Sequence, residues 1–270
     1  MSRRVWLVAD DYGISPAVDD GILELLDAGR LSGTACMTLF PEWPVEAKRL
    51  RASRVERAGI HLTLTDQLAC SGLSSLAPKG KLPSISRLLA GSATGTIRAA
   101  DIEAELAAQM SRFTDAFDHS PAYIDGHQHV HFLPPVRRWL KGWAKAIRSP
   151  LPWLRGAPES SYSPKSPGMK IVTVRALARG FDSTMRAAGF PVNGPLAGFY
   201  DWVSGLDFAE TVEHALRTLP DAGVLMCHPG RVDKVLANRD HFTDTRAVEL
   251  AYLSSSDFSD ALASSGAVLA

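Results

Sequence analysis

The sequence has few cysteines, and they are not arranged for metal or disulfide chemistry. Among 270 residues only Cys36, Cys70 and Cys227 occur, and no two of them form a C-x-x-C pair. This spacing gives no support to a zinc knuckle or a redox pair, and an odd count disfavours a disulfide framework. Cys36 and Cys227 lie in apolar runs, so we expect both to be small buried hydrophobic residues of a reduced protein.

The sequence also lacks an excess of either charge and a long apolar run. Its 29 basic residues balance 29 acidic ones, and the pI is about 7.1. Electrostatic nucleic-acid binding needs a basic face, so we expect no nucleic-acid partner. No apolar stretch approaches the roughly 18 residues of a transmembrane helix, and the residues before Asp10 are too few for a secretory signal. We therefore expect a cytoplasmic protein without a transmembrane segment.

What the sequence does contain is an alternation of short apolar runs with helical segments. The predicted strands are residues 5–9, 33–40, 58–64, 122–125, 153–155, 196–200, 223–227 and 267–269. Such alternation predicts an α/β fold in which helical crossovers connect parallel strands. With about seven units, the chain would form either a distorted (β/α) TIM-like barrel or an open doubly wound sheet.

We predict one catalytic domain over residues 1–270, because no repeat or domain boundary is visible. Two segments interrupt the alternation, residues 65–99 and residues 156–169, and we predict both to be lids or inserts. We predict a helix over residues 16–28 that Ser15 caps. A second predicted helix covers residues 170–188 without a break.

Four polar clusters lie in or just after predicted strands. They are the Asp10-Asp11 pair, His61, the histidine run that follows Asp125, and His228. Each alone has an ordinary explanation, namely a capping turn, a hydrogen-bonded core histidine, a surface strand or a Pro-Gly turn. A barrel, however, brings polar residues from the carboxyl ends of several strands to one place. The placement of the clusters therefore favours the barrel.

The histidine run has an alternating pattern, with His127, His129 and His131 separated by single residues. On a strand-like segment all three side chains would face one way. Only some of them could then reach one ion. We expect the preceding Asp125 to orient an imidazole that binds the metal.

These residue types suit metal-assisted hydrolysis of an amide or ester. Two imidazoles and one carboxylate with open positions form a common mononuclear metal site. Asp11, His61 and one histidine of the run could supply that set. A bound metal would polarise a carbonyl oxygen and lower the pKa of its water toward about 7. Asp10 could then act as general base, and His228 could protonate the leaving group.

At these residues the sequence resembles the YdjC-like carbohydrate deacetylases, the group that includes the ChbG and HpnK proteins. The matching motifs are ADDYGIS, GIHLTLT, an E-x5-Q pair at Glu103 and Gln109, YIDGHQHVHFLP and MCHPG, which together span essentially the whole chain. The resemblance implies a distorted barrel that hydrolyses the N-acetyl group of an amino sugar. The substrate would be an N-acetylated sugar, such as a chitooligosaccharide or a glycolipid.

The resemblance also implies roles for the residues of the clusters. Asp11, His61 and His127 would bind one divalent metal ion. Asp10 would be the base that activates water, and His228 would be the acid toward the amine.

Four further residues are candidates for substrate binding or for support of the site. Arg155 matches a family arginine that orients the base or contacts substrate. Tyr12 stands where phenylalanine is usual, so it would place a hydroxyl near the metal. Asp125 and His129 complete this group.

The residues leave other functions open. Another mononuclear metal-dependent amidohydrolase or phosphoesterase on a barrel would use similar ligands, and so would a non-haem iron oxygenase. A non-catalytic sugar-binding protein would need no base and no acid, so Asp10 and His228 speak against it. The metal is expected to be zinc or magnesium, with nickel, cobalt or iron as alternatives. A homodimer is the default expectation for a soluble enzyme.

Overall fold

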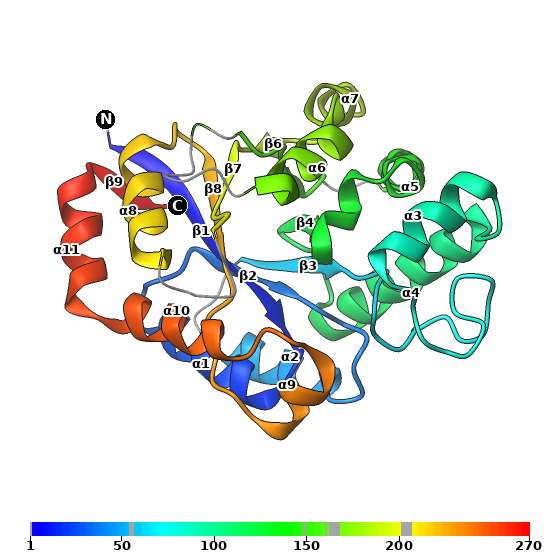
Figure 1. Ribbon diagram of the computed structural model, residues 1–270, viewed down its shortest axis with the longest axis horizontal. Coiled ribbons are helices and arrows are strands. Elements are labelled where there is room, and N and C mark those ends of the chain that lie inside the picture. The colour runs from blue at the N-terminus through cyan, green and yellow to red at the C-terminus, as the bar shows by residue number, and fades with distance from the viewer. Residues whose placement is uncertain (1, 54–56, 148–149, 160, 162–167, 201–206) are drawn as a thin grey trace.

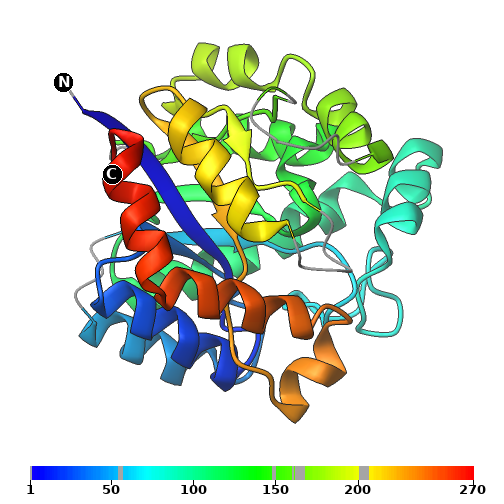
Figure 2. The ribbon, with the colours of Figure 1, turned by 60° about the vertical axis from the view of Figure 1, so that its left-hand side comes forward.

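The computed structural model describes residues 2–53, 57–147, 150–159, 161, 168–200 and 207–270. The strands of these residues are β1 Arg3–Tyr12, β2 Gly33–Cys36, β3 Ala58–Leu62, β4 Tyr123–Gly126, β5 Trp153–Arg155, β6 Val192–Asn193, β7 Leu196–Ala197, β8 Gly223–Cys227 and β9 Ala267–Leu269. The helices are α1 Pro16–Asp27, α2 Trp43–Ala52, α3 Ile85–Thr94, α4 Ala99–Phe117, α5 Pro134–Ala146, α6 Gly168–Ala178, α7 Phe181–Ala187, α8 Phe208–Thr218, α9 Lys234–Arg239, α10 Asp244–Ser254 and α11 Ser256–Ser265. Helices surround the sheet in the views of Figures 1 and 2.

The strands pair in parallel in the order β6-β5-β4-β3-β2-β1-β8-β7, and β9 pairs with β1. The two ends of this order, β6 and β7, are separated in the chain only by Gly194 and Pro195. One short stretch therefore pairs with β5 through Val192 and with β8 through Leu196, so the curled sheet returns on itself. The predicted distorted α/β barrel is confirmed. Among the described residues the strands number nine, because β6, Val192–Asn193, joins the eight strands that the sequence predicts.

The long strand β1 lies between β2 and β8, with β9 beside its first residues. It is buried without interruption from Leu7 to Tyr12. A parallel strand covered on both faces contains apolar residues in succession rather than in alternation. This environment explains the continuous apolar run before Asp10.

The signals that bound α1 act as predicted. The side chain of Ser15 accepts a hydrogen bond from the backbone N–H of Val18 at 3.3 Å, and Pro16 begins the helix. Gly29, just past the helix end, has a φ of +67°, a conformation that glycine adopts at little cost.

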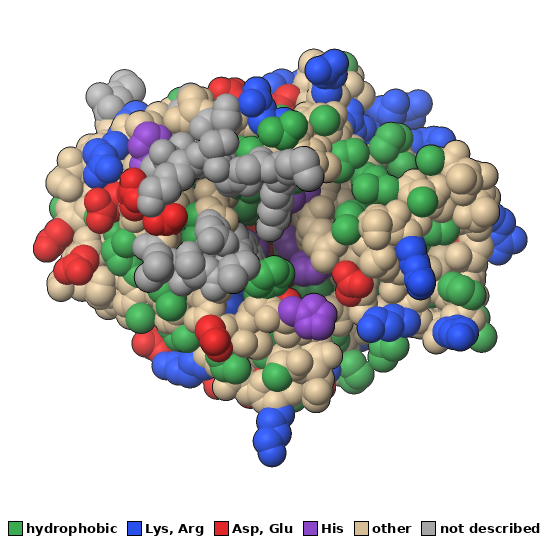
Figure 3. All heavy atoms as spheres, in the orientation of Figure 1, with side chains coloured by type: hydrophobic (Ala, Val, Ile, Leu, Met, Phe, Trp, Pro, Cys, Tyr) green, Lys and Arg blue, Asp and Glu red, His purple; other side chains and the backbone are tan. Residues whose placement is uncertain are grey.

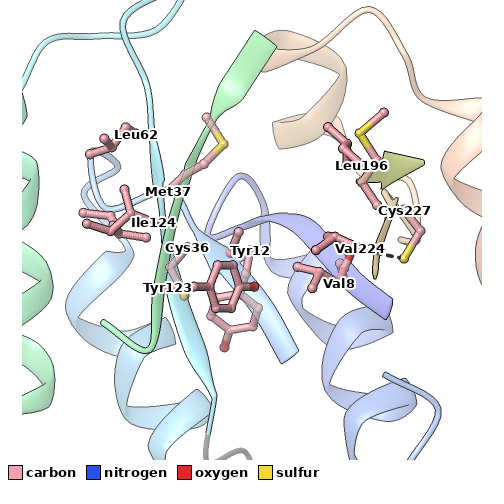
Figure 4. Close-up of a cluster of buried hydrophobic side chains, with 14 of the residues drawn as sticks. Val8, Tyr12, Cys36, Met37, Leu62, Tyr123, Ile124, Leu196, Val224 and Cys227 are labelled. Atoms are coloured by element: carbon pink, nitrogen blue, oxygen red, sulfur yellow. Dashed lines mark hydrogen bonds between the residues drawn. The ribbon is translucent and has the colours of Figure 1, made fainter. Parts of the chain in front are cut away.

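Buried apolar side chains fill the centre of the sheet, as Figure 4 shows. Cys36 and Cys227 belong to this cluster and are at most 1% exposed. The Cys227 thiol donates to the backbone oxygen of Val8 at 3.4 Å. Burial raises the pKa of both thiols well above the usual range, so they are poor nucleophiles. Their prediction as core residues is confirmed.

The histidine run does not continue the strand. β4 ends at Gly126, and residues His127–Phe132 form a 3₁₀ helix instead. Gln128 and His129 have left-handed backbone conformations, with φ values of +51° and +60°. The prediction that this segment is strand-like, with its three histidines on one face, is therefore wrong, because the backbone turns at Gln128 and His129.

Several other predicted elements are shorter than expected. The predicted helix over residues 170–188 is divided into α6 and α7, since Gly180 between them has a φ of +67°. The predicted strands over residues 33–40, 58–64 and 196–200 end at Cys36, Leu62 and Ala197.

The segment of residues 65–99 packs against α4. Leu68 and Lys81 form an antiparallel bridge within it, and α3 follows. Figure 1 shows this segment in cyan at one edge of the molecule. Residues 160 and 162–167, half of the segment 156–169, lie outside the described residues. The assignment of both segments as lids, and the single catalytic domain, stay predictions.

None of the described helices combines the length and the apolar character that a membrane span requires. The cytoplasmic location and the homodimer stay predictions from the sequence.

Candidate metal and catalytic site

Two adjacent aspartates at the end of β1 reach one site because the strand is irregular there. In a regular strand, neighbouring side chains point to opposite faces. The pairing of β1 with β2 shifts register between Ala9 and Tyr12, and Asp11 has a φ of +67°. Irregularities of this kind redirect side chains beside active sites. Asp10 and Asp11 are consequently both buried, and each lies close to a histidine of the site.

Asp11, His61 and His127 converge from three elements, namely β1, β3 and the turn after β4. Oδ1 of Asp11 lies 3.1 Å from Nδ1 of His127 and 3.4 Å from Nε2 of His61. One ligand atom from each residue lies within 4.8 Å of the other two. One carboxylate and two imidazoles in this arrangement fit a divalent metal ion that retains open coordination positions. The structure thus brings the three predicted ligands together.

Asp125 orients His61 from the side opposite to Asp11. Oδ1 of Asp125 lies 2.6 Å from Nδ1 of His61, which leaves Nε2 facing Asp11. A carboxylate in this position fixes the ring and the tautomer of a metal-binding histidine. Burial alone would lower the pKa of His61, but the carboxylates of Asp125, Asp10 and Asp11 raise it to about 9.

Arg155 holds Asp10 through both carboxylate oxygens. Its Nη1 and Nη2 lie 2.7 and 2.5 Å from Oδ2 and Oδ1, and both residues are buried. Burial raises the pKa of Asp10, and the charge of Arg155 offsets only part of the rise. The guanidinium of Arg155 also forms an ion pair with Oδ2 of Asp125. Nε2 of His228 lies 3.6 Å from Oδ2 of Asp10.

The site meets solvent through two of its histidines. The side chains of His127 and His228 are 16% and 11% exposed, whereas those of Asp10, Asp11 and His61 are at most 2% exposed. Figure 3 shows a hollow near the centre of this face with histidine inside it. A group that enters from solvent would therefore meet His127 and His228 before the carboxylates.

Tyr12 does not place a hydroxyl in the site. Its hydroxyl donates to the backbone oxygen of Glu46 in α2 at 2.9 Å, and the residue is fully buried. Figure 4 draws Tyr12 within the buried cluster that includes Cys36. The hydroxyl that Tyr12 was expected to place near the metal instead bonds α2, because the side chain belongs to the core.

The other two histidines of the run lie among aromatic rings. The His129 ring is 5.3 Å from that of Phe199, and the His131 ring is 3.9 Å from that of Phe132. Burial lowers the pKa of His131 well below its usual value, which favours the neutral form of its ring. A role of His129 in substrate binding stays a prediction.

Helix α10 supplies two site contacts that sequence reasoning missed. Nη2 of Arg246 lies 2.6 Å from Oδ2 of Asp11, and Glu249 accepts the backbone N–H of His228 at 2.5 Å. Burial raises the pKa of Asp11, but Arg246 and His127 together lower it well below the usual range. Arg246 and Glu249 are three positions apart and so share one helix face. This spacing is the signal in the sequence that could have indicated both contacts. It is weak, because charged residues on a helix usually face solvent.

The chain is similar over nearly its whole length to known proteins. A chitooligosaccharide deacetylase from Klebsiella pneumoniae is 26% identical over 269 residues, which cover 98% of this chain and 96% of that protein. A chitooligosaccharide deacetylase from Yersinia enterocolitica is 26% identical over 238 residues, or 87% of this chain and 85% of that protein.

A solved structure of similar fold is an Enterococcus faecalis protein named for cellobiose-phosphate cleavage. It has a TM-score of 0.77 and 21% identity, and the match covers 100% of this chain and 97% of that chain. At this identity the likeness shows the fold alone. The family described as YdjC-like protein matches residues 4–264. Because that match spans nearly the whole sequence, the chain belongs to the YdjC-like protein family.

Proposed function

We propose that this protein is a metal-dependent hydrolase that removes the N-acetyl group from an acetylated amino sugar, with chitooligosaccharides as the substrate class. The observation that carries the proposal is the base–metal arrangement. Asp10, held by Arg155, lies directly beside the ligand group of Asp11, His61 and His127. The curated relatives named chitooligosaccharide deacetylase support the choice of substrate.

Asp11, His61 and His127 are the residues that would hold the metal. They fit it because their donor atoms converge from buried or half-buried positions and because Asp125 fixes the ring of His61. When bound, a divalent metal polarises an amide carbonyl and lowers the pKa of water. The donor set suits zinc, and it also admits nickel, cobalt, iron or magnesium.

Asp10 acts as the general base on the water that attacks the acetyl carbonyl. Its pKa is raised by burial, which makes the carboxylate a better proton acceptor near neutral pH than an exposed aspartate would be. Arg155 keeps both oxygens of Asp10 in place, so the carboxylate needs no reorientation before it takes the proton.

His228 acts as the general acid toward the departing amine. Nε2 of His228 lies 3.6 Å from Oδ2 of Asp10, so the two groups border one reaction space. The water supplies a hydroxyl to the acetyl carbon while the C–N bond breaks. His228 supplies the proton for the nitrogen, and the products are acetate and a free amino sugar.

The test is acetate release from a panel of N-acetylated mono- and oligosaccharides, with and without added divalent metal. A phosphate monoester in the same panel probes the phosphoesterase alternative. We expect release only with metal. Asp10→Asn should keep metal affinity and lose at least about 100-fold in turnover, because general-base catalysis contributes roughly 100- to 10,000-fold.

The matched control is Asp118→Asn. Asp118 directly follows α4, is 77% exposed and pairs with Arg51 in α2. This variant should turn over like the wild type. Normal turnover by Asp10→Asn would remove the base assignment, and cleavage of the phosphate ester alone would replace the proposed reaction.

A further inference from the structure

Arg246 gives the two oxygens of Asp11 different neighbours. Oδ2 of Asp11 lies 2.6 Å from Nη2 of Arg246. Oδ1 of Asp11 instead faces the imidazoles of His127 and His61, at 3.1 and 3.4 Å. Only one oxygen of this carboxylate is therefore turned toward the ligand group.

Arg246 is itself held on several sides. Its Nη2 lies 2.6 Å from Oδ2 of Asp240, and its Nε donates to the backbone oxygen of Phe242 at 3.1 Å. Its own backbone oxygen accepts the N–H of Gly230 at 3.1 Å. The side chains of Arg246 and Asp11 are each 1% exposed, so water does not compete for their contact. An arginine fixed in this way can hold a carboxylate in one orientation.

We propose that Arg246 is a positioning residue that restricts Asp11 to single-oxygen ligation of the metal, an inference that rests on the proposed metal site. A carboxylate that is free to turn can offer a metal two oxygens or none. With Oδ2 occupied by Arg246, Asp11 contributes one donor atom, as His61 and His127 do. Three protein donors leave the remaining coordination positions open for water and substrate, which is the pattern of catalytic rather than structural sites.

The charge of Arg246 has an opposing effect that the structure moderates. A cation beside a ligand carboxylate weakens the attraction of that carboxylate for a metal ion. Asp240 places a second carboxylate on the same nitrogen of Arg246 and compensates this charge. Loss of Arg246 should therefore act mainly through the orientation of Asp11.

The test compares Arg246→Met and Arg246→Lys with the wild-type protein. The zinc dissociation constant of each metal-free protein is measured by calorimetry, and the visible absorption of each cobalt-loaded protein reports its coordination number. We expect Arg246→Met to weaken zinc binding by about 10- to 100-fold, the usual loss when a residue that orients a metal ligand is removed. Its cobalt spectrum should change toward higher coordination. Arg246→Lys, which keeps a donor and the charge, should recover part of the affinity.

The matched control is Arg30→Met. Arg30 anchors the end of the same helix, since its Nη1 donates to the backbone oxygens of Leu253 and Ser255, and it does not contact Asp11. If Arg30→Met lost as much zinc affinity as Arg246→Met, docking of α10 rather than the Arg246 contact would control the site. That result would overturn the inference.

The inference and the proposed function fail in distinguishable ways. A folded Arg246→Met protein with wild-type zinc affinity and an unchanged cobalt spectrum would overturn the role of Arg246 alone. Absence of zinc and cobalt binding by the wild-type protein would overturn the metal site itself and this role with it. If Arg246→Met did not fold, Arg246→Lys and Asp240→Asn would decide, and unchanged affinity in both would overturn the role.

Discussion

Arg155 and Asp10 form a two-pronged ion pair, in which Nη1 and Nη2 lie 2.7 and 2.5 Å from the two carboxylate oxygens. The same guanidinium reaches Asp125, and Asp125 in turn orients His61. One buried cation therefore connects the proposed base with the support of a proposed metal ligand. Removal of a buried partner of this kind leaves an uncompensated charge, so substitutions here should keep the charge.

The first prediction concerns the geometry of this pair. Arg155→Lys keeps the charge but replaces a planar fork by a point charge. Asp10 should then turn more freely, and kcat should fall by about 100-fold, the effect of misplacing a reacting group by about 1 Å. Turnover kinetics measure the loss, and zinc calorimetry should show metal affinity within about threefold of the wild type. Arg112→Lys is the control, because Arg112 donates to the backbone oxygen of Phe40; equal losses in both variants would contradict the prediction.

The second prediction concerns the proton that the metal must displace. Ligation requires a neutral imidazole, and the pKa of His61 in the metal-free protein is raised to about 9. Metal affinity should therefore rise with pH until about pH 9 and then level off. In Asp125→Asn a principal cause of the raised pKa is lost, so the affinity should level off at a lower pH. Calorimetry across this range measures both profiles, and coincident profiles would exclude the role of Asp125.

The third prediction links Glu249 to stability. Burial raises the pKa of Glu249 from 4.5 to about 7. Folding therefore favours its protonated form, and this contribution to the free energy of unfolding is full below pH 4.5 and is lost as the pH rises through about 7. The glutamine of Glu249→Gln does not titrate, so its contribution does not change with pH. As the pH rises over this range, the wild type should therefore lose up to about 3 kcal/mol of unfolding free energy relative to the variant.

Urea unfolding of Glu249→Gln and wild type at a series of pH values measures this difference. The control is Glu103→Gln, since Glu103 is 41% exposed and pairs with Arg138. Its difference from the wild type should stay flat with pH. A flat difference for Glu249→Gln as well would show that Glu249 stays ionised in the folded protein.

The fourth prediction concerns the segment that packs on α4. Glu105 is fully buried and accepts the backbone N–H groups of Cys70 and Ser71 at 3.0 and 2.8 Å. Glu105→Ala should cost at least about 3 kcal/mol of unfolding free energy, because these two hydrogen bonds and a third from the Gln109 side chain to the carboxylate are lost. Amide exchange at residues 70 and 71 should accelerate. Glu103→Ala, two positions away and exposed, should stay within about 0.5 kcal/mol of the wild type; equal effects would show that the contact does not hold the segment.

The fold followed from the sequence because its signals are local. The run that ends at Asp10 predicts a strand buried on both faces, and β1 is buried in this way. Ser15 predicts the start of α1, and its side chain caps that helix. The failures are also physical. The histidines at 127, 129 and 131 have the two-residue spacing of a strand. Two residues with left-handed backbone conformations form a turn there instead. The spacing of residue types does not indicate these backbone angles.

The sequence by itself determined which residue types lie at the carboxyl ends of the strands, and the parallel topology was enough to bring Asp10, Asp11, His61 and His228 together. Only the tertiary structure decided how each of them is held. Arg246 and Glu249 belong to a helix far along the chain from Asp11, and their contacts exist because α10 packs against the end of the barrel. The sequence around a charged residue in a helix looks the same whether its side chain faces solvent or a buried carboxylate. The burial of its face is a property of the packed molecule, and no window of the sequence contains it.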